Sequence, residues 1–147
     1  AATYGNVYVA QISLEANQNQ ALKAIAEAES YPGPSLIIGY TPCINHGLKG
    51  GMSHTIEEAK EAVESGYWQL YRYDPRLAAR GKDPMRLDFK KAEFDKIPAF
   101  VEKQTRFSAL HNLKQNDAEV AAMLEQTTED MRERSEHYTR MAAMKKQ

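Results

Sequence analysis

Two short, almost uninterrupted apolar runs stand near the start of the chain. Residues 7–12 read VYVAQI and residues 35–40 read SLIIGY, and neither run alternates regularly between apolar and polar positions. A half-exposed strand alternates, whereas a strand that is covered on both faces, as in a parallel sheet, is apolar throughout. Both runs are therefore predicted to be buried strands of a parallel sheet.

A helix is predicted between these two strands. Asn17 and Gln20 have the spacing of an N-terminal capping box, and the apolar positions that follow predict a helix that runs to about Glu29. The sequence YPGP at residues 31–34 then ends the helix, because proline cannot continue it. The predicted apolar stripe of this helix consists of Leu22, Ile25 and Ala26.

Strand, helix and strand together form a βαβ unit, whose crossover is expected to be right-handed. The segment TPCINHG, residues 41–47, follows directly after the second strand. In open α/β sheets, ligands and cofactors gather at the carboxyl ends of the strands. Residues 41–47 are therefore the first candidate for a functional site.

The middle of the chain predicts one more helix and two short strands. Thr55 and Glu58 have capping-box spacing, and the helix that they begin is weakened near its end by Gly66. Residues 68–73, WQLYRY, alternate between bulky and polar side chains and predict a strand, onto which residues 85–89 are expected to pair back. The apolar face of the helix is predicted to consist of Ile56, Ala59, Val63 and Tyr67. The acidic side chains expected to be solvated are Glu57, Glu58, Glu61 and Glu64.

The C-terminal third is predicted to be helical. Residues 96–110 are predicted to form one helix with Pro98 in its first turn, and Asn116 with Glu119 has the spacing of a cap for a long last helix. The chain as a whole is predicted to be an α/β protein: a partial parallel sheet with flanking helices, followed by a helical region from about residue 94 to residue 147. The apolar stripe of the last helix is predicted to consist of Val120, Leu124, Thr127, Met131 and Tyr138.

The bulk composition excludes several classes of partner. The chain has 147 residues, of which 42% are hydrophobic, and a formal net charge of −1. A net charge this close to zero gives no electrostatic attraction to nucleic acid or to an anionic membrane. No apolar run reaches the roughly 20 residues of a membrane-spanning helix. A single cysteine excludes an internal disulfide framework, so we expect a cytoplasmic protein. A buried strand that begins this early needs neighbours on both sides, so we also expect a piece of a longer protein.

The single cysteine, Cys43, leaves three chemical interpretations open: a buried small hydrophobe, a nucleophile or a metal ligand. It lies in a loop beyond a strand, Pro42 fixes the backbone before it, and polar residues follow it, all of which suit a ligand. As a nucleophile it needs a base, and His46 is three residues away. An iron–sulfur cluster needs about four thiolates, so its other ligands have to come from elsewhere.

Other groups of polar residues indicate little chemistry. The histidines are scattered without the paired spacing of a metal site, and we expect solvated or capping roles for them. Residues 47–51, GLKGG, lack the GxxxxGK[ST] spacing of a phosphate-binding loop. No catalytic or organic-cofactor-binding residue is therefore predicted. The histidines are His46, His54, His111 and His137.

Longer stretches of the chain resemble one known family. The most specific of them are PGPSLIIGYTPCINHG, residues 32–47, and ESGYWQLYRYDP, residues 64–75. From about Tyr4 to the last helix, the chain resembles the carboxyl part of the thiamine-diphosphate domain of pyruvate:ferredoxin (flavodoxin) oxidoreductases. The resemblance implies that the chain is a C-terminal fragment of such an enzyme.

The resemblance also implies a function and a role for Cys43. Enzymes of this family are large homodimers that decarboxylate pyruvate on thiamine diphosphate with Mg²⁺, form acetyl-CoA from CoA, and pass electrons through [4Fe-4S] clusters to ferredoxin or flavodoxin. Four cysteines hold the cluster nearest to thiamine, and by this match Cys43 is the fourth. The family's other three cysteines and its thiamine, Mg²⁺ and pyruvate motifs have no counterpart in this chain. The fragment is therefore expected to supply one metal ligand and to be inactive alone.

Two alternatives from other classes remain open at this point. The chain can be a freestanding structural or interaction module that reuses this fold, with Cys43 merely buried and no iron bound. It can also be a cytosolic thiol protein with a reactive Cys43, which predicts rapid alkylation of the thiol.

Overall fold

The computed structural model describes residues 1–89, 91–111 and 117–143. The strands are β1 (Tyr8–Ile12), β2 (Ser35–Gly39), β3 (Tyr71–Tyr73) and β4 (Met85–Leu87). The α-helices are α1 (Gln18–Glu29), α2 (Thr55–Glu64), α3 (Pro75–Ala78), α4 (Ile97–Glu102), α5 (Thr105–Ser108) and α7 (Asp117–Ala143). The short 3-10 turns are η1 (Ala2–Tyr4), η2 (Met52–His54) and η3 (Phe94–Lys96).

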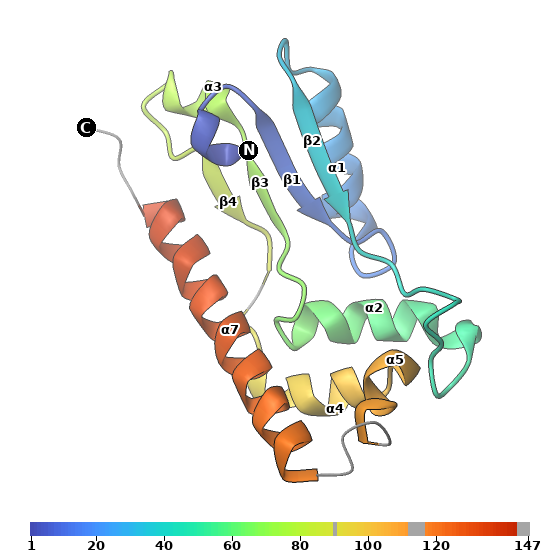
Figure 1. Ribbon diagram of the computed structural model, residues 1–147. Helices are drawn as coiled ribbons and strands as arrows, with labels where there is room; N and C mark the ends of the chain where they lie inside the picture. The colour runs from blue at the N-terminus through green and yellow to red at the C-terminus, as the bar shows by residue number, and fades with distance from the viewer. Residues whose placement is uncertain (90, 112–116, 144–147) are drawn as a thin grey trace.

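The described strands form one sheet in the order β2-β1-β3-β4 (Figure 1). β1 and β2 are parallel, as the predicted βαβ unit requires. β3 runs antiparallel to β1, and β4 runs antiparallel to β3. The predicted pairing of residues 85–89 is therefore confirmed over Met85–Leu87. The α/β class is confirmed, and the sheet is parallel at its β2 end only.

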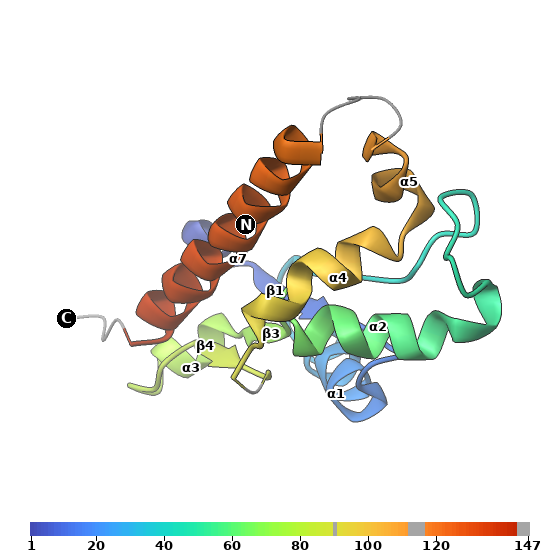
Figure 2. The same cartoon turned by 90° about the horizontal axis from the view of Figure 1, so that it is seen from below.

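Helices cover the sheet from both sides (Figure 2). On one side α1 packs against Tyr8 and Ala10 of β1. On the other side α7 packs Tyr138 onto Val9 and Tyr71. The stripe predicted for the last helix is confirmed, because all its members are buried or half-buried in α7. The predicted cap Asn116 lies outside the described residues. No helix in the described part of the chain is both long and apolar enough to cross a bilayer.

α1 begins as predicted but buries a different face. The side chain of Asn17 accepts a hydrogen bond from the Gln20 N–H at 3.0 Å, which confirms the cap. The predicted apolar stripe is wrong, since Leu22 is 61% exposed and Ile25 is 46% exposed. Small side chains face the sheet instead and let the helix approach it closely. The buried positions of α1 are Gln20, Ala21 and Ala24.

β2 is an edge strand in the described chain. Leu36 is 42% exposed and Ile38 is 39% exposed, so the prediction of a strand covered on both faces is wrong for this chain. The physical reason is the strand order: no described element lies beyond β2, and α7 lies over the opposite end of the sheet.

Long-range contacts reshape two predicted elements. The helix predicted for residues 96–110 is interrupted, because Gln104 is extended (φ −85°, ψ 119°) and its backbone pairs with Leu48. The strand predicted for residues 68–73 is reduced to β3, since the Trp68 N–H donates to the carbonyl of Ala62 at the end of α2. Both changes depend on partners that are distant in sequence.

α2 also departs from its predicted pattern. Its N-cap is His54, without a side-chain hydrogen bond, so the capping box of Thr55 and Glu58 does not form. Glu58 points inward and is 6% exposed, with its Oε1 atom 3.9 Å from Lys103 Nζ. Burial raises the pKa of the Glu58 carboxyl, and Lys103 opposes this effect. The prediction that Glu58 is solvated is therefore wrong, as is the placing of Ile56, which is 51% exposed, on a buried face.

Candidate functional site

Cys43 lies in the turn that follows β2, and it is exposed. The N–H groups of His46 and Gly47 both donate to the Cys43 carbonyl oxygen, each at 3.2 Å. These backbone bonds hold the turn at the carboxyl end of the parallel β1–β2 pair, the edge at which a site was predicted. The interpretation of Cys43 as a buried small hydrophobe is therefore wrong.

The turn is anchored by the junction between α4 and α5. The Thr105 N–H donates to the Gly47 carbonyl at 3.2 Å, and the Lys49 N–H donates to the Lys103 carbonyl at 2.9 Å. These bonds join two segments that are more than fifty residues apart in the chain. The broken helix thus has a role, because its extended residue Gln104 lets the backbone of this junction hold the Cys43 loop.

A pocket of about 280 Å³ opens beside Cys43. Its wall includes Tyr40 and Trp68, whose ring centroids are 5.5 Å apart, and Tyr67, which stands edge-on to Tyr40 at 6.3 Å. His46 lines the same pocket. Cys43 therefore borders a hollow with a large aromatic surface.

Hydrogen bonds fix this aromatic wall in place. Trp68 Nε1 donates to the Ile12 carbonyl at 2.9 Å, and Gln104 Nε2 donates to the Tyr40 hydroxyl at 3.2 Å. Arg106 Nη2 in turn donates to Gln104 Oε1 at 2.7 Å and brings a positive charge to the pocket. Burial raises the pKa of Tyr40 to about 12, so its hydroxyl stays protonated at neutral pH.

This arrangement offers one soft ligand, a fixed aromatic wall and a positive charge that favours an anionic ligand. Within residues 1–89, 91–111 and 117–143, no three or more His, Cys, Asp and Glu side chains come together so that they could hold a metal ion. A metal group bound at Cys43 has to take its other ligands from outside these residues.

Among the histidines, His111 has defined side-chain contacts and behaves as a polar surface group. His111 Nδ1 lies 3.0 Å from Asp117 Oδ1 at the start of α7, and its Nε2 lies 3.4 Å from Glu102 Oε1. The hydrogen bond with Asp117 raises the pKa of His111. These contacts tie the start of α7 to the end of α4, but they join side chains and do not cap a helix.

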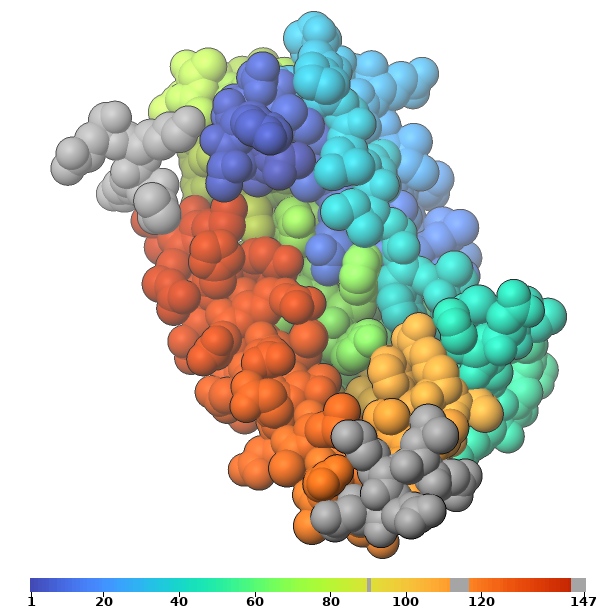
Figure 3. Space-filling model, in the orientation of Figure 1, coloured from blue at the N-terminus to red at the C-terminus, as the bar shows by residue number. Residues whose placement is uncertain are grey.

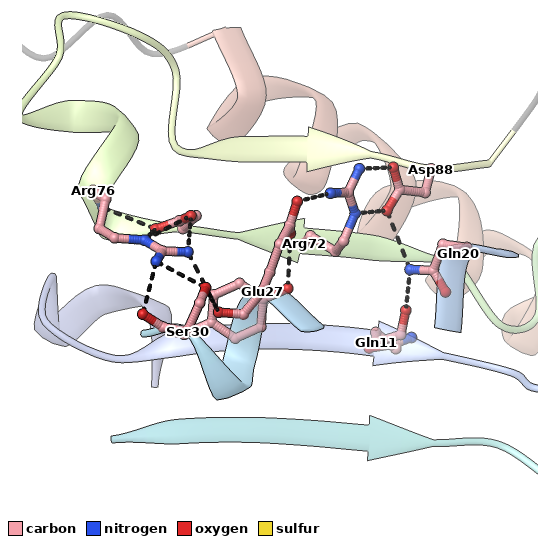
Figure 4. Close-up of polar contacts among 9 residues, drawn as sticks. Gln11, Gln20, Glu27, Ser30, Arg72, Arg76 and Asp88 are labelled. Carbon is pink, nitrogen blue, oxygen red and sulfur yellow. Dashed lines mark hydrogen bonds and ion pairs between the residues drawn. The ribbon is translucent and has the colours of Figure 1, made fainter. Parts of the chain in front are cut away.

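A second polar cluster lies on the α1 side of the sheet, and only a weak signal in the sequence points to it. Arg72 of β3 is 6% exposed. Its guanidinium binds both carboxylate oxygens of Asp88, at 2.6 and 2.8 Å, and Glu27 Oε1 of α1 at 2.6 Å (Figure 4). Gln20 Nε2 joins Asp88 to the Gln11 carbonyl. The signal was a single arginine between two aromatic residues in YRY.

This cluster is structural. The hydrogen bonds with Asp88 raise the pKa of the Arg72 guanidinium, and those with Glu27 add to the effect. The Tyr8 hydroxyl donates to Glu27 Oε2 at 3.0 Å, and burial raises the pKa of Tyr8. Each charge therefore has partners within the cluster, which clamps α1 onto β3 and β4.

Gly47 in the Cys43 loop is expected to accept a side chain only at a cost in stability. Its φ of +67° disfavours other residues, and an added Cβ would lie 3.0 Å from Thr105 Oγ1. Gly81 has a φ of +68° with nothing within 4 Å and is the matched control. We expect Gly81→Ala to cost about 1 kcal/mol of unfolding free energy and Gly47→Ala about 1 kcal/mol more, measured by urea unfolding. Equal costs would show that the contact with Thr105 is unimportant.

Comparison with known proteins gives the chain its relatives, although no family model matches it. A pyruvate-flavodoxin oxidoreductase of Enterobacter agglomerans is 50% identical over 143 residues, which are 97% of this chain and 12% of that protein. A pyruvate:ferredoxin oxidoreductase of Moorella thermoacetica is 44% identical over 142 residues, again 97% of this chain and 12% of that protein. A mitochondrial pyruvate dehydrogenase [NADP(+)] of Euglena gracilis is 46% identical over 142 residues, 96% of this chain and 8% of that protein.

These similarities relate the chain to a segment of large oxidoreductases. The chain matches a segment of pyruvate-flavodoxin and pyruvate:ferredoxin oxidoreductases, as its sequence predicted, and it spans 12% of the length of the bacterial relatives named above.

Proposed function

We propose that the chain is the C-terminal segment of a pyruvate:ferredoxin (flavodoxin) oxidoreductase and that Cys43 is one thiolate ligand of a [4Fe-4S] cluster. The observation that carries the proposal is the exposed thiol of Cys43 on a fixed turn at the carboxyl end of the β1–β2 pair. The relatives supply the reaction class, because their names describe oxidoreductases that act on pyruvate.

The chain supplies one of the four thiolate ligands that such a cluster needs. Clusters of this type are held by four cysteine thiolates. Cys43 is exposed, so thiolates of another segment can approach the same cluster. The turn is held by bonds to the Cys43 backbone carbonyl rather than to the thiol, which leaves the sulfur free for a metal.

The neighbouring side chains have defined tasks in this proposal. Tyr40 and Trp68 exclude water from one side of the site, and Arg106 places a positive charge nearby. Burial and neighbouring charge both tune the reduction potential of a cluster. When bound, the cluster supplies one-electron transfer.

The proposal extends to the whole enzyme. Thiamine diphosphate, Mg²⁺ and CoA are bound by segments outside this chain, pyruvate is oxidatively decarboxylated to acetyl-CoA, and ferredoxin or flavodoxin accepts the electrons. The enzyme is a cytoplasmic homodimer. The 147-residue chain alone is inactive because the ligands of thiamine and pyruvate are not among its residues.

The test of this proposal is the Cys43→Ser variant of the full-length polypeptide. Iron content and the electron paramagnetic resonance signal of its clusters are compared with those of the wild type. Loss of one cluster supports the proposal, and an unchanged set of clusters overturns it.

A further inference from the structure

A chain of polar side chains leads from the surface to the wall of the Cys43 pocket. Arg106 Nη2 donates to Gln104 Oε1 at 2.7 Å, and Gln104 Nε2 donates to the Tyr40 hydroxyl at 3.2 Å. Arg106 is exposed, whereas Gln104 is only 4% exposed. In Figure 3 the loop that follows β2, in cyan to teal, lies against the junction of α4 and α5, in amber. Both segments contribute to the pocket, so the polar chain ends beside Cys43.

The chemistry of these groups fixes the direction of the hydrogen bonds. A guanidinium can only donate, so Gln104 has to present its amide oxygen to Arg106. The amide nitrogen of Gln104 then faces Tyr40, and it can only donate as well. The Tyr40 oxygen therefore accepts, and its own hydrogen is left to donate to another group. Each bond in such a chain polarises the next, which makes the last O–H a stronger donor.

The hydrogen of the Tyr40 hydroxyl has no acceptor in the part of the chain that the structure describes. Gln104 is the one hydrogen-bond partner of this hydroxyl among the described residues. Burial raises the pKa of Tyr40 to about 12, and Glu58 adds the smallest of the effects on it without a hydrogen bond. The half-buried hydroxyl is thus a protonated donor that lacks an acceptor. Such a donor favours a ligand that can accept in the pocket.

We propose that the Tyr40 hydroxyl donates a hydrogen bond to an anionic sulfur atom of the metal group bound at Cys43, and that Gln104 and Arg106 hold and polarise this hydroxyl. The inference rests on the proposed function, because it takes Cys43 as a ligand of an iron–sulfur cluster. Sulfide and thiolate sulfurs of a cluster accept hydrogen bonds, and these bonds help to set its reduction potential.

The hydrogen bond from Tyr40 is expected to raise the reduction potential of the cluster. Reduction adds one negative charge, and a fixed donor stabilises the reduced state more than the oxidised state. The N–H groups of His46 and Gly47 are bound to carbonyl oxygens of the turn, so they are not available to a sulfur atom. Tyr40 therefore tunes electron transfer without being a metal ligand.

Tyr40→Phe in the full-length polypeptide tests the inference, with Tyr31→Phe as the matched control. Tyr40→Phe removes the hydroxyl and keeps the ring that packs on Trp68. The Tyr31 hydroxyl donates to the Asn6 carbonyl at 2.8 Å, and neither residue lines the pocket. Redox titration followed by electron paramagnetic resonance gives the midpoint potential of each cluster.

We expect Tyr40→Phe to make the reduction of one cluster about tenfold less favourable, a fall of about 59 mV for one electron. Tyr31→Phe should change no potential. Unchanged potentials in Tyr40→Phe, or an equal fall in both variants, would overturn the inference.

A double-variant experiment tests the contribution of Gln104. Gln104→Leu removes the amide that holds the Tyr40 hydroxyl but changes no charge. We expect it to lower the potential in the wild-type background and to have no effect in the Tyr40→Phe background, because the two residues act through one hydroxyl. An equal fall in both backgrounds would show a merely structural effect and would contradict the inference.

Electron–nuclear double resonance of the reduced enzyme in D₂O gives a readout that does not depend on the potential. We expect a coupling to one exchangeable deuteron that is lost in Tyr40→Phe and kept in Tyr31→Phe, and its persistence in Tyr40→Phe would count against the inference. The affected cluster should be the one that Cys43→Ser removes. If Cys43→Ser removes no cluster, the proposed function fails and this inference fails with it. If Cys43→Ser removes a cluster that Tyr40→Phe leaves unchanged, this inference alone fails.

Discussion

Cys43→Ser in the full-length polypeptide is expected to remove one [4Fe-4S] cluster or change its signal. Serine keeps the size of the side chain but replaces a soft sulfur ligand by a hard oxygen, which iron–sulfur clusters bind poorly. The turn itself should persist, because its hydrogen bonds use the Cys43 carbonyl and not the thiol. Electron transfer from pyruvate to flavodoxin or ferredoxin should fall at least about a hundredfold.

The control for this variant is Ile44→Ala. Ile44 follows Cys43 in the same turn and is 73% exposed, so its truncation disturbs the loop without removing a sulfur. We expect normal iron content and a normal electron paramagnetic resonance signal for Ile44→Ala. A normal signal in Cys43→Ser would contradict the proposed ligand. Equal loss in both variants would show that the loop and not the thiol is required.

Arg72→Met is expected to destabilise the chain by about 3–5 kcal/mol. The variant keeps much of the side-chain volume but leaves Glu27 and Asp88 as carboxylates without their shared cation. Removing one partner of a buried ion pair costs about this much, because the other charge stays buried without compensation. Urea unfolding of the 147-residue chain, followed by the fluorescence of its single tryptophan, Trp68, measures the change.

Arg86→Met is the matched control for Arg72→Met. Arg86 lies directly opposite Arg72 in the ladder between β3 and β4, and it is exposed. Surface substitutions of this kind change stability by about 0.5 kcal/mol or less. A loss for Arg72→Met no larger than that for Arg86→Met would contradict the assignment of the Arg72 cluster as the clamp between α1 and the sheet.

Local signals predicted much of the N-terminal half. The apolar runs gave β1 and β2, and the spacing of Asn17 and Gln20 gave the start of α1, because both depend on short-range chemistry. The position of TPCINHG after a strand predicted that Cys43 lies at the carboxyl edge of the sheet. The uninterrupted apolar run of residues 35–40 predicted that β2 is buried. The strand is largely exposed, because it is an edge strand in the described chain.

Features that depend on distant partners were missed. The break between α4 and α5 follows from the pairing of Gln104 with Leu48, and no local sequence pattern within residues 96–110 predicts it. The Arg72 cluster needs Glu27, which is 45 residues away, and no periodic pattern joins the two. The stripe of α1 was misplaced because small alanines, rather than Leu22 and Ile25, face the sheet.

The central claim is that Cys43 binds iron, and anomalous diffraction at the iron absorption edge tests it most directly. Crystals of the full-length polypeptide, grown without oxygen, locate each iron atom relative to the sulfur of Cys43. We predict an iron atom within bonding distance of Cys43 Sγ, beside the pocket that Tyr40 and Trp68 line. Iron peaks elsewhere in the molecule, with none at Cys43, would contradict the account.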